Sequence, residues 1–183
     1  MLGPTLAGPT VTLAPIKPEH LEHYVDWFAD SLVTRFLNHV QAFTLQQEHE
    51  WLDRVSRSET EVAWGIFVEG RHIGGAAVSQ IDWRSRRGMT GIFIGDRNWW
   101  GRGVATEAMT LRTRYAFEEL GLEKLITQVV EGNVASRRAL EKVGYATVGV
   151  YRHHEFRQNR WWDVWIGELL RDDWLADHAS LTP

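Results

Sequence analysis

The stretch DRNWWGRGVATEA, residues 96–108, decides the fold of this chain. An apolar run typical of a strand (91–94) precedes it, and a pattern typical of a helix (104–120) follows it. Glycines at this junction let the backbone turn tightly and approach a ligand closely. Because the first turn of a helix carries unpaired N–H groups and the positive end of the helix dipole, the junction is a predicted phosphate-binding site.

Strand-like and helix-like segments alternate around this junction. Strands are expected at 11–15, 62–68, 72–79, 88–94, 125–130, 146–156 and 161–169, and helices at 18–30, from 44 onward, at 104–120 and at 133–143. The strands within 62–94 form an antiparallel meander, and a crossover unit follows. We predict one α/β domain over residues 1–183, with a mixed, mostly antiparallel central sheet of about seven strands flanked by about four helices. Residues 1–10 are expected to be a loose leader and 175–183 a tail.

Composition excludes several functional classes. The 20 basic and 24 acidic residues give a net charge of −4, which argues against binding to nucleic acid or to an anionic membrane. The chain has no cysteine, so disulfides, thiolate metal sites and a cysteine acyl-enzyme are excluded. No signal peptide or membrane-spanning run is evident, so a cytoplasmic protein is expected. The ten tryptophans suit either core packing or an aromatic wall that contacts a cationic amine.

Two common phosphate-binding motifs do not fit the junction. A Walker A loop requires GxxxxGK[ST], which is absent. A dinucleotide-binding fingerprint requires GxGxxG, but Thr106 occupies the position of the third glycine. That fingerprint also belongs to a parallel βαβ unit, whereas antiparallel strands precede the junction here.

Three blocks resemble the GNAT superfamily of N-acetyltransferases, in particular its ribosomal-protein (RimJ/RimL-type) group. Residues 100–108 are similar to the group's W-G-[KR]-G-x-[GA]-T-E-A, and residues 133–145 to its N-x-x-S-x-x-x-L-x-K-x-G-[FY]. Residues 149–152 together with 162–164 resemble its closing block. Trp100 departs from the wider superfamily, which has Gln or Arg at this place.

The resemblance implies acetyl-CoA as the co-substrate and no metal. Its diphosphate would bind to backbone N–H groups, and its pantetheine arm would pair with a strand edge that also supplies an N–H for the thioester oxyanion. Asn133 would bind the pantetheine from the other side. The N–H groups implied for the diphosphate are those of Arg102, Gly103, Val104, Ala105 and Thr106, and the strand edge is that of Phe93, Ile94 and Gly95. His20 and His23 lie three residues apart on a predicted helix, but no third metal ligand accompanies them.

The resemblance also implies two catalytic residues. Ser136, the serine of N-x-x-S, would protonate the departing thiolate, and Glu155, 19 residues later, would accept the proton of the amine. The alternatives are a helix cap for Ser136 and an exposed strand glutamate for Glu155. Glu107 is interpreted as a first-turn residue that the helix dipole stabilises. With no cysteine available, direct attack in a ternary complex is the expected route.

The identity of the acceptor is the most open part of the prediction. The resemblance points first to a protein N-terminal α-amine, and the alternatives are an aminoglycoside, a polyamine, an amino acid or a small toxin. Outside the enzymes, the alternative is a CoA-binding sensor without catalysis. The expected partners are acetyl-CoA and an amine, without nucleic acid or membrane, and the family and the tryptophan content are compatible with a homodimer.

Overall fold

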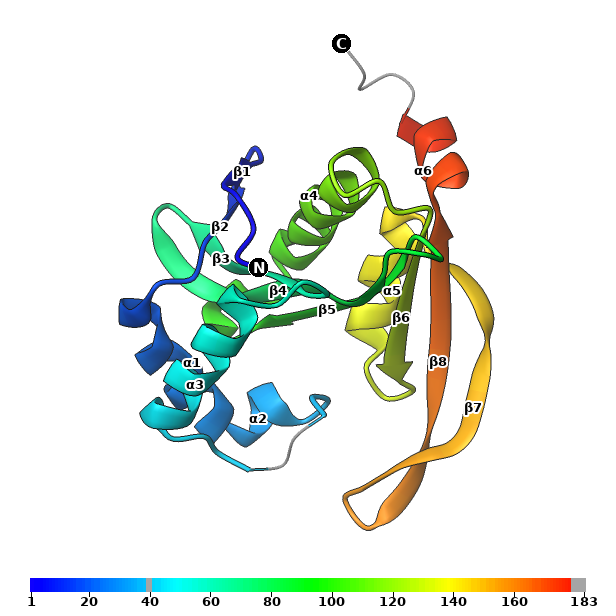
Figure 1. Ribbon diagram of the computed structural model, residues 1–183. Coiled ribbons are helices and arrows are strands. Elements are labelled where there is room, and N and C mark those ends of the chain that lie inside the picture. The colour runs from blue at the N-terminus through cyan, green and yellow to red at the C-terminus, as the bar shows by residue number, and fades with distance from the viewer. Residues whose placement is uncertain (39–40, 179–183) are drawn as a thin grey trace.

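One eight-stranded sheet with helices on both faces forms the molecule (Figure 1). The computed structural model describes residues 1–38 and 41–178. Its strands are β1 (Leu6–Ala7), β2 (Val11–Ala14), β3 (Val62–Val68), β4 (Arg71–Asp82), β5 (Arg87–Ile94), β6 (Lys124–Val130), β7 (Ala146–Arg157) and β8 (Arg160–Leu170). Its helices are η1 (Pro18–His20), α1 (Leu21–Ala29), α2 (Ser31–Thr34), α3 (Leu45–Ser56), η2 (Arg97–Trp99), α4 (Val104–Glu118), α5 (Val134–Val143) and α6 (Arg171–His178). The predicted α/β architecture is confirmed, with β1, α2 and α6 as additional elements.

The sheet opens in its middle. Its strand order is β1-β2-β3-β4-β5-β6-β8-β7, and β5–β6 is the one parallel neighbour pair among the described strands. The β5–β6 ladder ends after the pair Met89↔Ile126, and the two strands then diverge (Figure 1). The backbone of β5 beyond Met89 therefore has no strand neighbour on this side.

The two faces of the sheet are covered differently. Helices α4 and α5 cover one face, where their apolar residues pack with Trp64, Leu125 and Trp165. Helices α1 and α3 lie side by side on the other face, over the β3–β5 half (Figure 1). Phe36, which follows α2, packs with Val130 and Trp162 over the β6–β8 half. The segment around α2 thus links the two halves on the α1 side of the opening.

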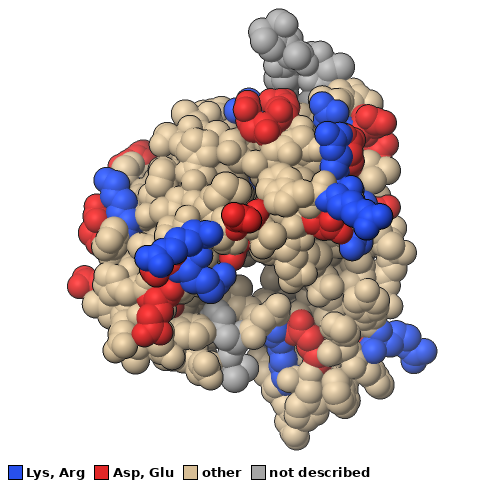
Figure 2. All heavy atoms as spheres, viewed as in Figure 1, with Lys and Arg blue, Asp and Glu red and all other residues tan. Residues whose placement is uncertain are grey.

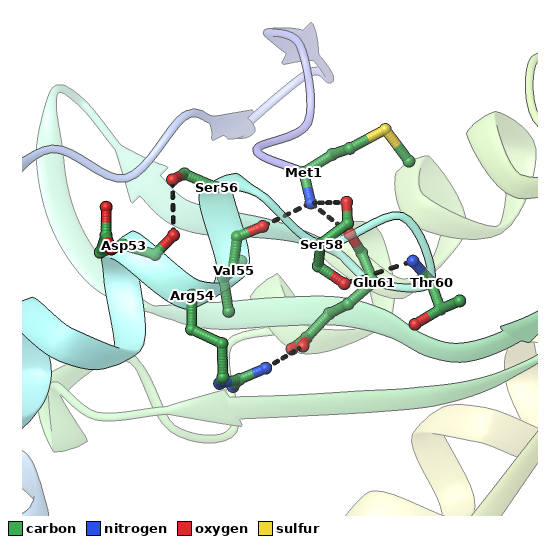
Figure 3. Close-up of polar contacts among 8 residues, drawn as sticks. All are labelled: Met1, Asp53, Arg54, Val55, Ser56, Ser58, Thr60 and Glu61. Atoms are coloured by element: carbon green, nitrogen blue, oxygen red, sulfur yellow. Dashed lines mark hydrogen bonds and ion pairs between the residues drawn. The ribbon is translucent and has the colours of Figure 1, made fainter.

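Residues 1–10 are bonded to the rest of the domain, so the expectation of a loose leader is wrong. The Met1 ammonium group donates hydrogen bonds to the carbonyl oxygens of Val55 (2.5 Å) in α3 and of Ser58 (3.0 Å) and Glu61 (2.5 Å) between α3 and β3 (Figure 3). These bonds hold the start of the chain beside β3.

Glu107 fixes the other end of this segment. Strand β1 pairs with β2, and the Glu107 Oε1 atom accepts hydrogen bonds from the backbone N–H groups of Thr10 and Val11, at 2.8 Å each. Glu107 therefore anchors the first residues of β2 to α4, a role that its position in the first helical turn did not indicate.

The predicted tail is also partly structured. Residues 175–178 continue α6, in which Trp174 is buried, and residues 179–183 lie outside the described part of the chain. Within the described residues, no helix has both the length and the apolar character needed to cross a membrane.

Candidate active site

The junction between β5 and α4 has the geometry of an anion cradle. Gly101 and Gly103 have φ angles of +72° and +82°, a left-handed conformation that favours glycine. Gly103 is the N-cap of α4 and no side chain caps the helix, so its first N–H groups stay free of a side-chain acceptor. A Cβ atom at either glycine would meet no protein atom within 4 Å. The glycines therefore serve the turn and access to the backbone rather than internal packing.

The register of β5 decides which of its backbone groups face the opening. The Gly95 N–H donates to the Ile73 carbonyl oxygen of the β4 side at 2.8 Å, and backbone groups in a strand alternate in direction. Phe93 and Gly95 are therefore bonded toward β4, whereas Ile92 and Ile94 face the opening. Of the predicted residues Phe93, Ile94 and Gly95, Ile94 alone presents its backbone there. The sequence did not identify Ile92, because which residues of a strand direct their backbone groups to a given side is known only once the register with the neighbouring strand is known.

Trp100, the departure from the superfamily pattern, contacts the same edge. Its indole Nε1–H donates to the Ile94 carbonyl oxygen at 2.8 Å. A cavity of about 460 Å³ adjoins this contact, between the end of α1 and the β5–α4 loop. It is lined by Trp27, Asp30, Gly95, Asp96, Arg97, Asn98 and Trp100. The end of β5 is thus open to a ligand beside the cradle.

Asn133 and Ser136 lie together at the start of α5. The Asn133 Oδ1 atom accepts a hydrogen bond from the Ser136 N–H at 3.3 Å, so Asn133 is the cap of this helix. The half-buried Ser136 hydroxyl has no hydrogen-bond partner among the described residues. The capping alternative for Ser136 therefore does not hold, and its hydroxyl is available to a ligand.

Glu155 belongs to a hydrogen-bond network that joins distant segments of this chain. It pairs with Arg157, whose Nε lies 2.5 Å from the carboxylate, and Arg157 also donates to the Leu37 carbonyl oxygen and to Asn38 Oδ1 (3.0 Å). These bonds tie the β7–β8 hairpin to the segment after α2. On the face shown in Figure 2, the surface is hollowed between the main body and this hairpin.

The structure does not bring the two predicted catalytic residues into contact. Ser136 begins α5, which packs with α4 on one side of the sheet. Glu155 is the register partner of Trp162, whose side chain packs on the opposite side, with Phe36. Any reaction that uses both residues must take place at the opening between these sides.

Sequence comparison assigns the chain to a family. A family model described as an acetyltransferase (GNAT) domain matches residues 10–146, three quarters of the chain. The chain belongs to the GNAT acetyltransferase family. The comparison supports N-acetyltransferase chemistry and thus an enzyme, while the RimJ/RimL-type subgroup remains a finer hypothesis.

The relatives of this GNAT enzyme have names that refer to different substrates. It is 29% identical to the FsC-acetyl coenzyme A-N(2)-transacetylase of Aspergillus fumigatus, over 98% of this chain and 87% of the relative. It is 25% identical to the spermidine N(1)-acetyltransferase of Escherichia coli, over 93% and 91% of the two chains. The spermidine N-acetyltransferase of Vibrio cholerae, solved with CoA and spermine, has the same fold, with a TM-score of 0.86 at 18% identity over 92% and 99% of the chains.

GNAT acetyltransferases use acetyl-CoA, and the residues present fit it. The uncapped start of α4 behind Gly101 and Gly103 suits a diphosphate, and the free edge of β5 suits the amide groups of pantetheine. No described residue fills the space in front of either glycine. This fit depends on backbone groups, which explains why the departure at Trp100 leaves the cradle intact.

The GNAT enzyme also holds buried polar groups that sequence reasoning missed. Glu48 on α3 is 4% exposed, and burial raises the pKa of its carboxyl group to about 7. The buried Tyr24 hydroxyl has no hydrogen-bond partner within residues 1–38 and 41–178, and burial, followed by the Glu48 charge, raises its pKa. Glu48 lies four and seven residues before Leu52 and Val55 on the buried face of α3. This spacing could have revealed the buried carboxylate from the sequence, since it places Glu48 on the apolar face of a helix.

Histidines cluster near Tyr24. His72 Nδ1 lies 3.1 Å from His23 Nδ1, and the His72 and His20 rings are 4.9 Å apart. Burial, then the neighbouring histidines, lowers the pKa of His72 to about 3, so its imidazole is neutral at physiological pH. Within the described residues, no histidine or carboxylate group has the arrangement of a metal site. His72 is buried against the rings of His20 and Phe67, whereas His23 is exposed.

Proposed function

We propose that this enzyme acetylates a primary amine by direct attack on acetyl-CoA in a ternary complex. The observation that carries the proposal is the uncapped start of α4 beside the free edge of β5. The diphosphate would bind the N–H groups of residues 102–106, and the pantetheine would pair with Ile92 and Ile94 and contact Asn133. Acetyl-CoA supplies the acetyl thioester, and the free N–H groups of β5 would donate to its developing oxyanion.

The proposed proton transfers use Ser136 and Glu155. The Ser136 hydroxyl has no hydrogen-bond partner among the residues that the structure describes, which supports its role as the donor to the departing thiolate. Glu155 would accept the proton of the attacking amine, and its pairing with Arg157 would hold the carboxylate in place. The location of Glu155 on the hollowed side of the sheet supports an acceptor that enters there.

For the acceptor, the RimJ/RimL-type motifs support a protein N-terminal α-amine. A small cationic amine is the second candidate, because Glu48 is buried without a partner among the described residues and its charge acts on Tyr24 of the aromatic cluster on the α1 side of β5. The relative named for spermidine supports the same candidate.

Binding and turnover test the proposal separately. A ligand that binds only the folded state at about 100 times its Kd stabilises it by about 2.7 kcal/mol, so acetyl-CoA should raise the melting temperature. Release of free thiol from acetyl-CoA is then followed with peptides that have free N-termini and with small amines. An unchanged melting temperature at millimolar acetyl-CoA would refute the binding site, and binding without thiol release for any amine would favour a sensor.

We further propose that the enzyme is a homodimer formed through β7. This strand is an edge of the sheet, and Val148, Val150, Tyr151 and Phe156 expose about half of their side chains on it. An exposed apolar edge strand is a template for pairing with a second chain. Sedimentation equilibrium should give twice the monomer mass, and Val150→Lys should reduce it to the monomer mass.

A further inference from the structure

Glu48 differs from the other carboxylates of α3. Asp53 pairs with Arg57, and Glu50 accepts a hydrogen bond from Gln46, both at the surface. Glu48 is 4% exposed and has no hydrogen bond or ion pair within the described residues. Burying a carboxylate without a partner is unfavourable, so such a residue calls for an explanation.

Tyr24 connects this carboxylate to a group of aromatic rings that reaches β5, because the Glu48 charge acts on the Tyr24 hydroxyl. The Tyr24 ring lies 5.8 Å from that of Phe28, 5.4 Å from that of Trp51 and 5.6 Å from that of Phe93. Trp51 follows Glu48 by three residues and therefore shares its side of α3. We call Glu48, Tyr24, Phe28, Trp51 and Phe93 the Glu48 recess.

The recess adjoins the proposed reaction site through Phe93. Phe93 and Gly91 point to the same face of β5, since side chains alternate along a strand. Gly91 is exposed, and a Cβ atom there would meet nothing within 4 Å. This face of β5 therefore has free space directly beside an aromatic wall of the recess.

The second polar group of the recess, the Tyr24 hydroxyl, also lacks a hydrogen-bond partner in the described part of the chain. The Tyr24 hydroxyl lies above Gly75 of β4, where a Cβ atom would stand 2.9 Å from it, so glycine makes room for this oxygen. The Glu48 carboxylate acts electrostatically on the Tyr24 hydroxyl, yet no hydrogen bond joins them. A group that donates hydrogen bonds to both oxygens would satisfy both.

An alkylammonium group matches these requirements. It carries several N–H donors and a positive charge, and it is attracted to the faces of aromatic rings. We propose that the Glu48 recess binds an ammonium group of the acceptor, distinct from the amine that is acetylated. The preferred acceptor is then a straight-chain diamine or polyamine. This inference rests on the proposed acetylation of a primary amine at the β5–β6 opening.

Matched amines test the recess. Thiol release is measured for a series of straight-chain diamines and for monoamines of the same chain lengths, with the wild type, Glu48→Gln and the control Glu50→Gln. For the best diamine, Glu48→Gln should lower kcat/KM about ten-fold or more, mainly through KM, because a charged hydrogen bond is lost. The values for monoamines, and all values for the exposed control Glu50→Gln, should stay within about two-fold of the wild type.

A second variant and a binding measurement complete the test. Tyr24→Phe keeps the ring and removes the hydroxyl, so it should raise KM for the diamine several-fold while leaving KM for acetyl-CoA unchanged. Calorimetric titration of the diamine into the CoA-loaded wild type should give binding that Glu48→Gln loses, which keeps the inference testable if no amine is acetylated. If the enzyme acetylates diamines and monoamines with equal kcat/KM, the role of the recess is refuted and the proposed function still stands. Diamine binding without any turnover would support the recess and refute the proposed function.

Discussion

Glu48→Gln should change how the stability of the protein depends on pH. The carboxyl group of Glu48 has an ordinary pKa of 4.5, which burial raises to about 7 in the folded protein. The folded state thus holds this proton more tightly than the unfolded chain does. The resulting contribution to stability is complete below pH 4.5 and is lost as the pH rises through 7.

The size of the effect follows from the two pKa values. Each pKa unit corresponds to about 1.36 kcal/mol, so a rise from 4.5 to about 7 sets an upper bound of about 3.4 kcal/mol. Water that reaches the carboxylate reduces this value. We expect the wild type to lose about 1–3 kcal/mol relative to Glu48→Gln between pH 5 and pH 8.

Urea unfolding of both proteins across this pH range measures the difference. Every other titrating group, including His72, is present in both proteins, so its contribution cancels in the comparison. The missing charge appears as a pH-dependent gap between the two curves, whereas altered packing gives a constant offset. Two curves that stay parallel from pH 5 to pH 8 would refute the assignment of a buried, uncompensated carboxylate.

Four further substitutions test the remaining contacts. Gly103→Glu should abolish CoA binding in calorimetry because it adds charge and bulk at the cradle, and binding at wild-type affinity would mean that the diphosphate lies elsewhere. Glu155→Gln should lower kcat about 10²-fold or more with unchanged CoA affinity, whereas Arg157→Gln, which leaves the carboxylate, should lose less; equal losses would make Glu155 a structural partner of Arg157. Glu107→Ala should lower the free energy of unfolding by about 1–3 kcal/mol, since two N–H groups lose a charged acceptor, and an unchanged urea midpoint would show that this anchor is dispensable.

The elements with local signals were predictable from the sequence. Gly103 and Gly144 mark the start of α4 and the end of α5, and both have positive φ angles. Thr44 and Gln47 form the capping box that begins α3. These positions are set by the steric freedom of glycine and by hydrogen bonds within one helical turn, so the printed residues suffice.

Features that depend on distant parts of the chain were not predictable in the same way. The first residues were expected to be loose because glycine and proline there have no local pattern, but their hydrogen bonds go to α3 and to Glu107.

The helix α2 is too short to show a helical period in the sequence. Asp30 begins this helix by accepting a hydrogen bond from the Leu32 N–H.

The candidate site shows the same division. The cradle was located because its glycines are adjacent in sequence, whereas the choice of Ile92 and Ile94 requires the register of β5 against β4. The rings of the Glu48 recess come from α1, α3 and β5, and no single segment contains enough of them to reveal the recess.

The early end of the β5–β6 ladder has a consequence for the protein before it meets its co-substrate. The amides of Ile92 and Ile94 lie in the interior of a sheet, yet they should exchange with deuterium as quickly as those of a frayed edge. Occupancy by the pantetheine arm would slow that exchange selectively, so the coenzyme would act as the missing strand of an unfinished sheet.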